Sequence, residues 1–114
     1  MKSIYRLKKN YQYNYVYKHA SSVSDKYFVM LYCENKNKPT VRQTKVGFSV
    51  SKKYGKAVAR NRIRRQLKAA VSTFMPSVKD GYNVIFIPRR HETYLFTDVS
   101  QSVQYLLRKA GLLQ

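Results

Sequence analysis

The residues in this sequence that most clearly suggest chemistry are the lysines and arginines of one stretch, Ser49–Phe74. No aspartate or glutamate occurs between Glu34 and Asp80 to offset them. A solvated surface helix normally mixes both signs of charge to limit self-repulsion, so this one-signed charge points to phosphate binding. The cations are Lys52, Lys53, Lys56, Arg60, Arg62, Arg64, Arg65 and Lys68.

The side chains that a nuclease needs for hydrolysis are scattered. A nuclease acting alone usually holds metal ions with clustered carboxylates, or uses histidines as acid and base. His19 and His91 have no motif spacing, and there is neither a glycine-rich phosphate loop nor a nucleophile elbow. We therefore assign no catalytic residue and no metal ligand to this chain and expect a binding protein. The five carboxylates are Asp25, Glu34, Asp80, Glu92 and Asp98.

The cationic stretch also has the apolar spacing of a folded helix. Its apolar residues recur every three or four positions, as on one face of a helix. We expect Gly55 to be the N-cap and the helix to end near Met75, because Pro76 disfavours continuation. The apolar face holds Ala59, Ile63, Leu67, Ala70, Val71 and Phe74, and the opposite face holds Asn61, Arg64, Arg65 and Lys68, flanked by Arg62.

Three lysines crowd the start of this helix, where the helix dipole and unpaired N–H groups are already positive. This is unfavourable in a free protein and becomes favourable when a phosphate occupies the helix end. The plain alternative is a solvated basic face. The absence of any offsetting acidic residue around Lys52, Lys53 and Lys56 favours an anion-binding end.

The whole chain carries the same imbalance. Its 114 residues include 23 lysines and arginines against 5 acidic residues, which gives a formal charge of +18. Such an excess in a short chain indicates a polyanionic partner, and 11 tyrosines offer faces on which bases can stack. The length fits one domain over residues 1–114, with a basic N-terminal arm at residues 1–9.

A membrane surface is the rival polyanion. However, no apolar run approaches the roughly 18–20 residues of a spanning helix, and no basic helix has a bulky exposed apolar face. Cys33 is the only cysteine, so there is no intrachain disulfide and no thiolate cluster for zinc. The N-terminus lacks the apolar core of a secretory signal. We expect a cytoplasmic protein with no membrane partner and no disulfide-linked partner.

The remaining pattern predicts an α+β fold in the order α-β-β-α-β-α, a two-layer sandwich with a small mixed sheet of about four strands. Both ends of the chain should be helical. The first helix should run from about Tyr11 to Lys18 after an Asn10 cap, and Thr97 or Asp98 should cap the last. The aromatic helix puts Tyr13, Val16 and Tyr17 on one face, and the last helix has a stripe of Val99, Val103, Leu106, Leu107 and Ala110.

Three segments should form strands: Asp25–Cys33, Thr44–Ser51 and Tyr82–Ile87. The first has two apolar faces, with Leu31 on one and Tyr32 on the other. The second has an outer face of small residues, Gly47, Ser49 and Ser51, which another backbone could approach closely. We interpret Ser21–Ser24 as a polar turn, Glu34–Gln43 as a loop, Asp80–Gly81 as a turn and Pro88 as the end of the last strand.

Several of these segments together resemble the bacterial ribonuclease P protein family. They are RLKKN at Arg6–Asn10, the aromatic helix, KVGFSVSKKYGKAVARNRIRR at Lys45–Arg65 and QSVQYLLRKA in the last helix. The resemblance covers nearly the whole chain. It implies a single RNA-binding domain that assists the large RNA subunit of ribonuclease P, which removes the 5′ leader of precursor tRNA. The implied partners are that RNA and the leader, with Mg²⁺ held mainly by RNA and none by the protein alone.

The resemblance also implies roles for individual residues. The RNA-binding set would be Lys52, Lys53, Lys56, Arg60, Asn61, Arg62, Arg64, Arg65 and Lys68. A leader-binding cleft between the first helix and one face of the sheet would include Tyr13, Tyr17, Leu31, Ser49 and Arg89. It further implies a left-handed βαβ crossover through the basic helix, against the general right-handed preference.

This sequence departs from the family at two places. The family often has an aromatic residue at the position of Leu31, whereas here the aromatic residue is its neighbour Tyr32. Either the stacking platform is weaker or the strand shifts register, which would reverse every side chain in it. The Pro88–Arg89 junction also differs from the usual family sequence.

Two alternatives stay open on sequence alone. A ribosomal or other structural RNA-binding protein would have a similar small basic fold and would co-purify with ribosomal subunits. A nuclease that needs no RNA would still cleave after all RNA had been digested away.

Overall fold

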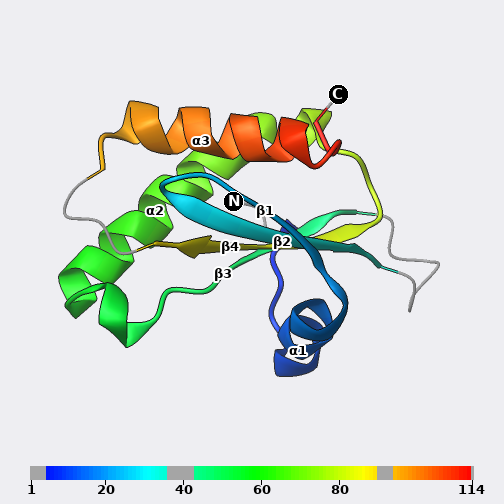
Figure 1. Cartoon of the computed structure of the whole chain (residues 1–114), viewed down its shortest axis with the longest axis horizontal. Coiled ribbons are helices and arrows are strands. Elements are labelled where there is room, and N and C mark those ends of the chain that lie inside the picture. The colour runs from blue at the N-terminus through cyan, green and yellow to red at the C-terminus, as the bar shows by residue number, and fades with distance from the viewer. Residues whose placement is uncertain (1–4, 36–42, 90–93, 114) are drawn as a thin grey trace.

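The computed structural model describes residues 5–35, 43–89 and 94–113. These form helices and strands in the order α-β-β-β-α-β-α, with short 3₁₀ turns η2 (Lys52–Tyr54) and η3 (Met75–Ser77) beside the second helix (Figure 1). The helices are α1 (Asn10–His19), α2 (Ala57–Phe74) and α3 (Phe96–Lys109). The strands are β1 (Ser21–Ser24), β2 (Phe28–Glu34), β3 (Lys45–Phe48) and β4 (Tyr82–Pro88).

The four strands form one mixed sheet in the spatial order β1-β2-β4-β3. The β1–β2 and β2–β4 pairs are antiparallel, whereas β3 and β4 are parallel and are joined through α2. The α+β class and the mixed sheet are confirmed, with one more strand in the element order than predicted. The left hand of the β3–α2–β4 crossover stays a prediction.

Helices cover both faces of this sheet (Figure 1). On one face, α2 and α3 pack over the larger core, which β2 and β4 supply with alternate residues. The predicted apolar stripes of α2 and α3 pack against these strand residues. Three members of the stripes are exceptions: Ala59 is exposed, and Phe74 and Ala110 are half-buried. The largest contributors from the sheet are Phe28, Met30, Val84 and Phe86.

On the other face, α1 covers a smaller core formed by Leu7, Val16 and Ile85. The N-terminal segment reaches this core by pairing Arg6 with Val46 along the edge of β3. Strand β4 is therefore buried on both faces, as its continuous apolar sequence predicts. Next to this core, the ring of Tyr13 lies directly over Gly47.

Several predicted boundaries were wrong. The N-cap of α2 is Lys56 and not Gly55, because η2 separates the end of β3 from the helix. Helix α1 already includes Asn10, and Leu95 caps α3 in place of Thr97 or Asp98. Ser21–Ser24 forms a strand and not a turn, because its backbone pairs with β2.

The other predicted features mostly agree with the structure. Gly81 has a φ of 90°, so the Asp80–Gly81 turn is confirmed, and Pro88 ends β4. Strand β3 is shorter than the predicted Thr44–Ser51. Most of the Glu34–Gln43 loop, with His91 and Glu92, lies outside the described residues. Every described helix is too short or too polar to span a bilayer.

The contact between Gly47 and Tyr13 yields a test of how α1 docks. A Cβ added to Gly47 would lie 2.7 Å from Tyr13 Cζ, so the ring would have to move. We expect Gly47→Ala to lower the free energy of unfolding by about 1–3 kcal/mol through overpacking, measured by urea denaturation. Gly55→Ala is the control, because its Cβ would meet only Ala59, at 3.3 Å.

The double variant Gly47→Ala, Tyr13→Ala separates this clash from a general effect of the methyl group. Because Tyr13→Ala removes the obstructing ring, we expect the added methyl to cost almost nothing in that background. An equal cost of Gly47→Ala with and without the Tyr13 ring would contradict this packing.

Candidate nucleic-acid interface

The start of α2 collects positive charge. Lys52 and Lys53 lie on η2 and Lys56 is the N-cap of α2, and all three side chains are exposed. The first turn of α2 contains no acidic residue, and no side chain caps its N–H groups. The dipole and lysines therefore add to one another, which creates a site suited to an anion.

The basic residues farther along α2 fall into two groups. Asn61, Arg62 and Arg65 are exposed, whereas Arg60, Arg64 and Lys68 are half-buried. Arg60 lies seven residues before buried Leu67, so both point toward the same side of the helix. Within the described part of the chain, Arg60 Nε is buried and has no hydrogen-bond partner.

Arg64 is held by a neighbour on its own helix. Its Nη1 donates a hydrogen bond to Asn61 Oδ1 at 3.2 Å, which steadies the guanidinium. The same guanidinium lies close enough to Tyr13 to oppose the rise in the pKa of that phenol. Arg6, from the N-terminal segment, acts on Tyr13 in the same direction. Positive charge from two segments thus acts on the phenol of Tyr13.

Two tyrosines of α1 hold it against the end of β3. Tyr17 Oη donates to Ser49 Oγ at 3.0 Å. Burial raises the pKa of Tyr13, and a backbone hydrogen bond from Phe48 partly offsets that rise. Gly47 is itself buried, because the Tyr13 ring occupies the space beside it. The close approach that the small residues of β3 allow is therefore made at Gly47 by a side chain of α1.

The sheet beside α1 is only partly covered. Leu31 faces the smaller core under α1, whereas Tyr32 packs against the larger core on the other face. The strand therefore keeps its ungapped register, and an aliphatic residue occupies the position where the family often has an aromatic one. Val29 and Ile87 pair across β2 and β4 and are half-buried. Val29 alternates with Leu31 along β2, and Ile87 alternates with Ile85 along β4, so the sequence pattern could have identified both residues.

Arg89 directly follows β4 and is exposed. Its N–H donates to the carbonyl of Tyr27 at 2.8 Å, and its own carbonyl accepts a hydrogen bond from Tyr94 Oη at 2.8 Å. Tyr94 is 5% exposed and stacks on Tyr54 of η2, with ring centroids 6.4 Å apart and an interplanar angle of 8°. Tyr94 therefore supports two segments, the turn that carries Lys52 and Lys53 and the backbone of Arg89.

No sequence pattern predicts this support, because Tyr54 and Tyr94 are 40 residues apart with no motif between them. Burial raises the pKa of the Tyr94 phenol, so the phenol keeps its proton at ordinary pH. Its O–H group therefore donates a hydrogen bond to the Arg89 carbonyl. The candidate site thus has two parts, the basic face of α2 and the tyrosine face of α1 that is held against the end of β3.

Comparison with known proteins identifies relatives over almost the whole chain. The family model described as Ribonuclease P matches residues 1–111. The ribonuclease P protein component of Clostridium kluyveri is 39% identical over 114 residues, covering 96% of each chain. That of Clostridioides difficile is 37% identical over 108 residues, covering 93% of this chain and 91% of the relative.

Solved structures agree with these relatives. The ribonuclease P protein of Staphylococcus aureus superimposes with a TM-score of 0.85 at 30% identity, covering 96% of this chain and 98% of that one. The Thermotoga maritima protein gives a TM-score of 0.79 at 25% identity, covering 91% and 96%. The chain therefore belongs to the bacterial ribonuclease P protein family and is the protein subunit of the endoribonuclease complex that processes the 5′ end of precursor tRNA.

Proposed function

We propose that this chain is one RNA-binding domain over residues 1–114, acting in the cytoplasm, that binds two RNAs side by side. The basic face of α2 and the N-terminal arm at residues 1–9 bind the ribonuclease P RNA subunit. The cleft between α1 and the sheet binds the 5′ leader of precursor tRNA. The hydrogen bond from Tyr17 to Ser49 carries the proposal, because it fixes an exposed aromatic ring of α1 beside the segment that leads from β3 into the basic helix.

The basic surface suits the backbone of a structured RNA. Phosphate contacts by lysine and arginine supply affinity without reading sequence, and they release counterions. Lys52, Lys53 and Lys56 add the positive end of α2 to this field. Arg60 is half-buried with its Nε enclosed by the protein, so the remaining N–H groups of its guanidinium are the ones that face an RNA phosphate. Asn61 orients Arg64 and leaves Arg62 and Arg65 free to reach other phosphates.

The cleft suits a single strand. Single-stranded bases stack on aromatic side chains, and this stacking tolerates any sequence. Tyr17 is 48% exposed although its hydroxyl is held by Ser49, so it presents a fixed ring edge and face. Leu31 extends the apolar floor, and Arg89 supplies positive charge at the end of β4. The leader would thus contact Tyr13, Tyr17, Leu31, Ser49 and Arg89.

The described residues do not fit a protein-held Mg²⁺ site. Mg²⁺ prefers carboxylate and phosphate oxygens, and the described residues offer no group of three His, Cys, Asp or Glu able to hold a metal ion. The surface around α2 is cationic and would repel a divalent cation. We infer that the Mg²⁺ ions are held mainly by RNA, and that the part of this chain is to neutralise phosphates and to orient the substrate.

The basic face can be tested by reconstitution with the cognate RNA at low Mg²⁺. We expect the protein to stimulate cleavage of precursor tRNA, and Arg60→Ala and Arg62→Ala each to weaken binding of the RNA subunit by roughly tenfold through a lost charged hydrogen bond. Each should also reduce the slope of log affinity against log salt by about one. Arg108→Ala, in the last turn of α3, is the control of equal charge. No stimulation by the unaltered protein would refute the proposal.

The cleft can be tested with leader-bearing and leaderless tRNA. Tyr17→Ala should cost about 1–3 kcal/mol of leader affinity by lost stacking, and Tyr13→Ala a similar amount. Tyr17→Phe removes only the hydrogen bond to Ser49, so we expect a much smaller loss. Tyr105→Ala removes an exposed tyrosine of α3 and should leave affinity unchanged. An equal loss for leaderless tRNA would place Tyr17 outside the leader site.

The formal charge of +18 leads to a test without RNA. Self-repulsion should leave the free fold marginal, and an anion that binds only the native state should stabilise it. We expect the thermal midpoint in low salt to rise with sulfate more than with chloride at equal ionic strength. If sulfate and chloride raise the thermal midpoint of unfolding equally, the chain has no specific anion-binding site.

A further inference from the structure

Helix α1 carries a second set of aromatic side chains. Tyr11, Tyr15 and His19 recur every four residues, so they form one stripe along the helix. With about 3.6 residues per turn, this stripe lies on the opposite side of α1 from Tyr13 and Tyr17, the two tyrosines proposed above for the leader. It is therefore a separate surface on the same ten-residue helix.

Burial does not explain this stripe. Tyr11 is 59% exposed, and His19 is exposed as well. Tyr15 is half-buried, but it packs against His19 and not into the smaller core, to which Tyr13 contributes. Among the described residues, the three side chains belong to neither apolar core. Aromatic rings left in water gain little from folding, so their alignment points to a ligand that covers them.

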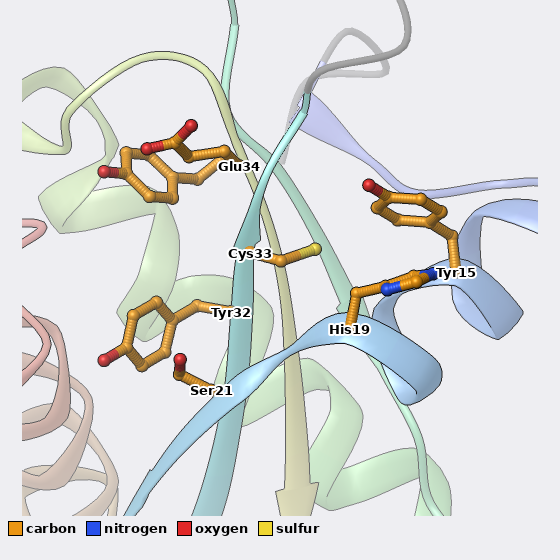
Figure 2. Close-up of a pocket in the computed structure, with 7 residues that line it drawn as sticks. Tyr15, His19, Ser21, Tyr32, Cys33 and Glu34 are labelled. Carbon is orange, nitrogen blue, oxygen red and sulfur yellow. The ribbon is translucent and has the colours of Figure 1, made fainter.

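Part of the stripe is ordered before any ligand arrives. The rings of Tyr15 and His19 lie against each other, with centroids 4.4 Å apart and an interplanar angle of 39°. They border a hollow of about 400 Å³ at the edge of the sheet, on the side to which Cys33 points (Figure 2). The two rings thus form a fixed wall beside an open space. A planar group could stack on this wall with little further loss of side-chain entropy.

The charge around the stripe suits a polyanion. No acidic residue precedes Asp25 in the chain. Lys18 is exposed on the outer surface of α1, between Tyr17 and the stripe, where it could neutralise a phosphate. Glu34 also lines the hollow, but it follows Cys33 on β2 and so points to the opposite face of the sheet from Tyr15 (Figure 2).

We propose that Tyr11, Tyr15 and His19 form a second stacking platform for unpaired bases of the precursor-tRNA leader. Aromatic side chains bind single-stranded bases of any sequence in this way. The strand would leave the cleft at Tyr17, cross the outer surface of α1 beside Lys18 and reach the platform on the other side. Because a helix with its side chains is about 10–12 Å across, a few nucleotides span this path. The inference rests on the proposed function, since the cleft has to hold the first part of the leader.

The fold indicates which part of the leader reaches the platform. In the proposed complex the basic helix lies on the RNA subunit, which separates the leader from the tRNA. The hydrogen bond from Tyr17 to Ser49 holds the cleft beside the segment that leads into this helix. The platform lies on the other flank of α1. Nucleotides near the tRNA would therefore occupy the cleft, and nucleotides nearer the 5′ end would occupy the platform.

Precursor tRNAs that differ in leader length test the proposal in the reconstituted complex. A short leader, which ends in the cleft, is obtained by removing nucleotides one at a time from the 5′ end of a long one. With the unaltered protein, we expect the long leader to bind at least about fivefold more tightly than the short one, as the stacking of one added base permits. In the double variant Tyr11→Ala, Tyr15→Ala this advantage should disappear. The same length dependence in both proteins would overturn the proposal.

Matched variants separate stacking from other effects. Tyr11→Phe and Tyr15→Phe keep the rings and should keep the advantage of the long leader, because stacking does not need the hydroxyl. Tyr105→Ala removes a tyrosine of similar exposure from α3 and should also keep it. Should the double variant unfold, Tyr11→Ala alone decides the question, because most of that side chain lies in water. A loss that Tyr11→Phe shares with Tyr11→Ala would exclude stacking.

The same assay distinguishes failure of the platform from failure of the cleft. Tyr17→Ala should weaken binding of the short and the long leader alike. If it does so while the double variant behaves like the unaltered protein, only the platform is refuted. If Tyr17→Ala changes neither affinity, the leader cleft itself is refuted. If the double variant weakens leaderless tRNA as much as the long leader, the stripe contacts the RNA subunit and its assignment to the leader is wrong.

Discussion

The burial of β4 on both faces is the constraint on which the rest of the structure depends. Val84 and Phe86 face the core under α2 and α3, while Ile85 faces the core under α1. A slip of one residue would exchange these two sets of side chains. Because β2 and β3 both pair with β4, this register fixes Leu31 beside α1 and places Gly47 under Tyr13. Both proposed RNA surfaces are therefore positioned by a strand whose central residues, Val84, Ile85 and Phe86, are fully buried.

The charge of the chain sets a second constraint, which works against the first. One face of α2 packs into the core, and the cations lie on the rest of the helix surface. Arg60, Arg64 and Lys68 are half-buried where the two surfaces meet. A half-buried cation loses hydration and gains little from neighbours of the same sign. The fold tolerates this because the large core, with Phe28, Phe86 and Leu67 fully buried, contributes the opposing free energy. The surface is left complementary to a polyanion.

Sequence patterns predicted those helices and strands in which a buried face makes apolar residues recur at a regular spacing. The stripe of α2, the apolar run of β4 and the stripe of α3 were all identified, because a buried face constrains residue type at each turn. Ser21–Ser24 was missed since an edge strand is defined by backbone pairing with β2, which its small polar side chains do not reveal. The prediction that Gly55 is the N-cap of α2 was wrong because a 3₁₀ turn precedes the helix and Gly55 ends that turn.

The site was predictable to the extent that it follows from local spacing. The cations of α2 and the Tyr13–Tyr17 pair belong to single helices, so periodicity placed them correctly. The orientation of Leu31 was ambiguous because both faces of β2 are apolar. The stacking of Tyr54 on Tyr94 and the cover of Gly47 by Tyr13 join residues far apart in the chain. Such contacts depend on the full topology, which no local pattern encodes.

The tyrosines show why aromatic residues with a polar end are used so heavily at this surface. Tyr17 bonds Ser49, Tyr94 bonds the Arg89 carbonyl, and Tyr13 is held by the backbone of Phe48. A phenylalanine at these positions could bury its ring but would have no hydroxyl to fix its orientation. The hydroxyl bonds hold the rings in place before RNA arrives. In the proposed leader site, the free energy of ordering Tyr13 and Tyr17 would thus be supplied by folding and would not be subtracted from the affinity for RNA.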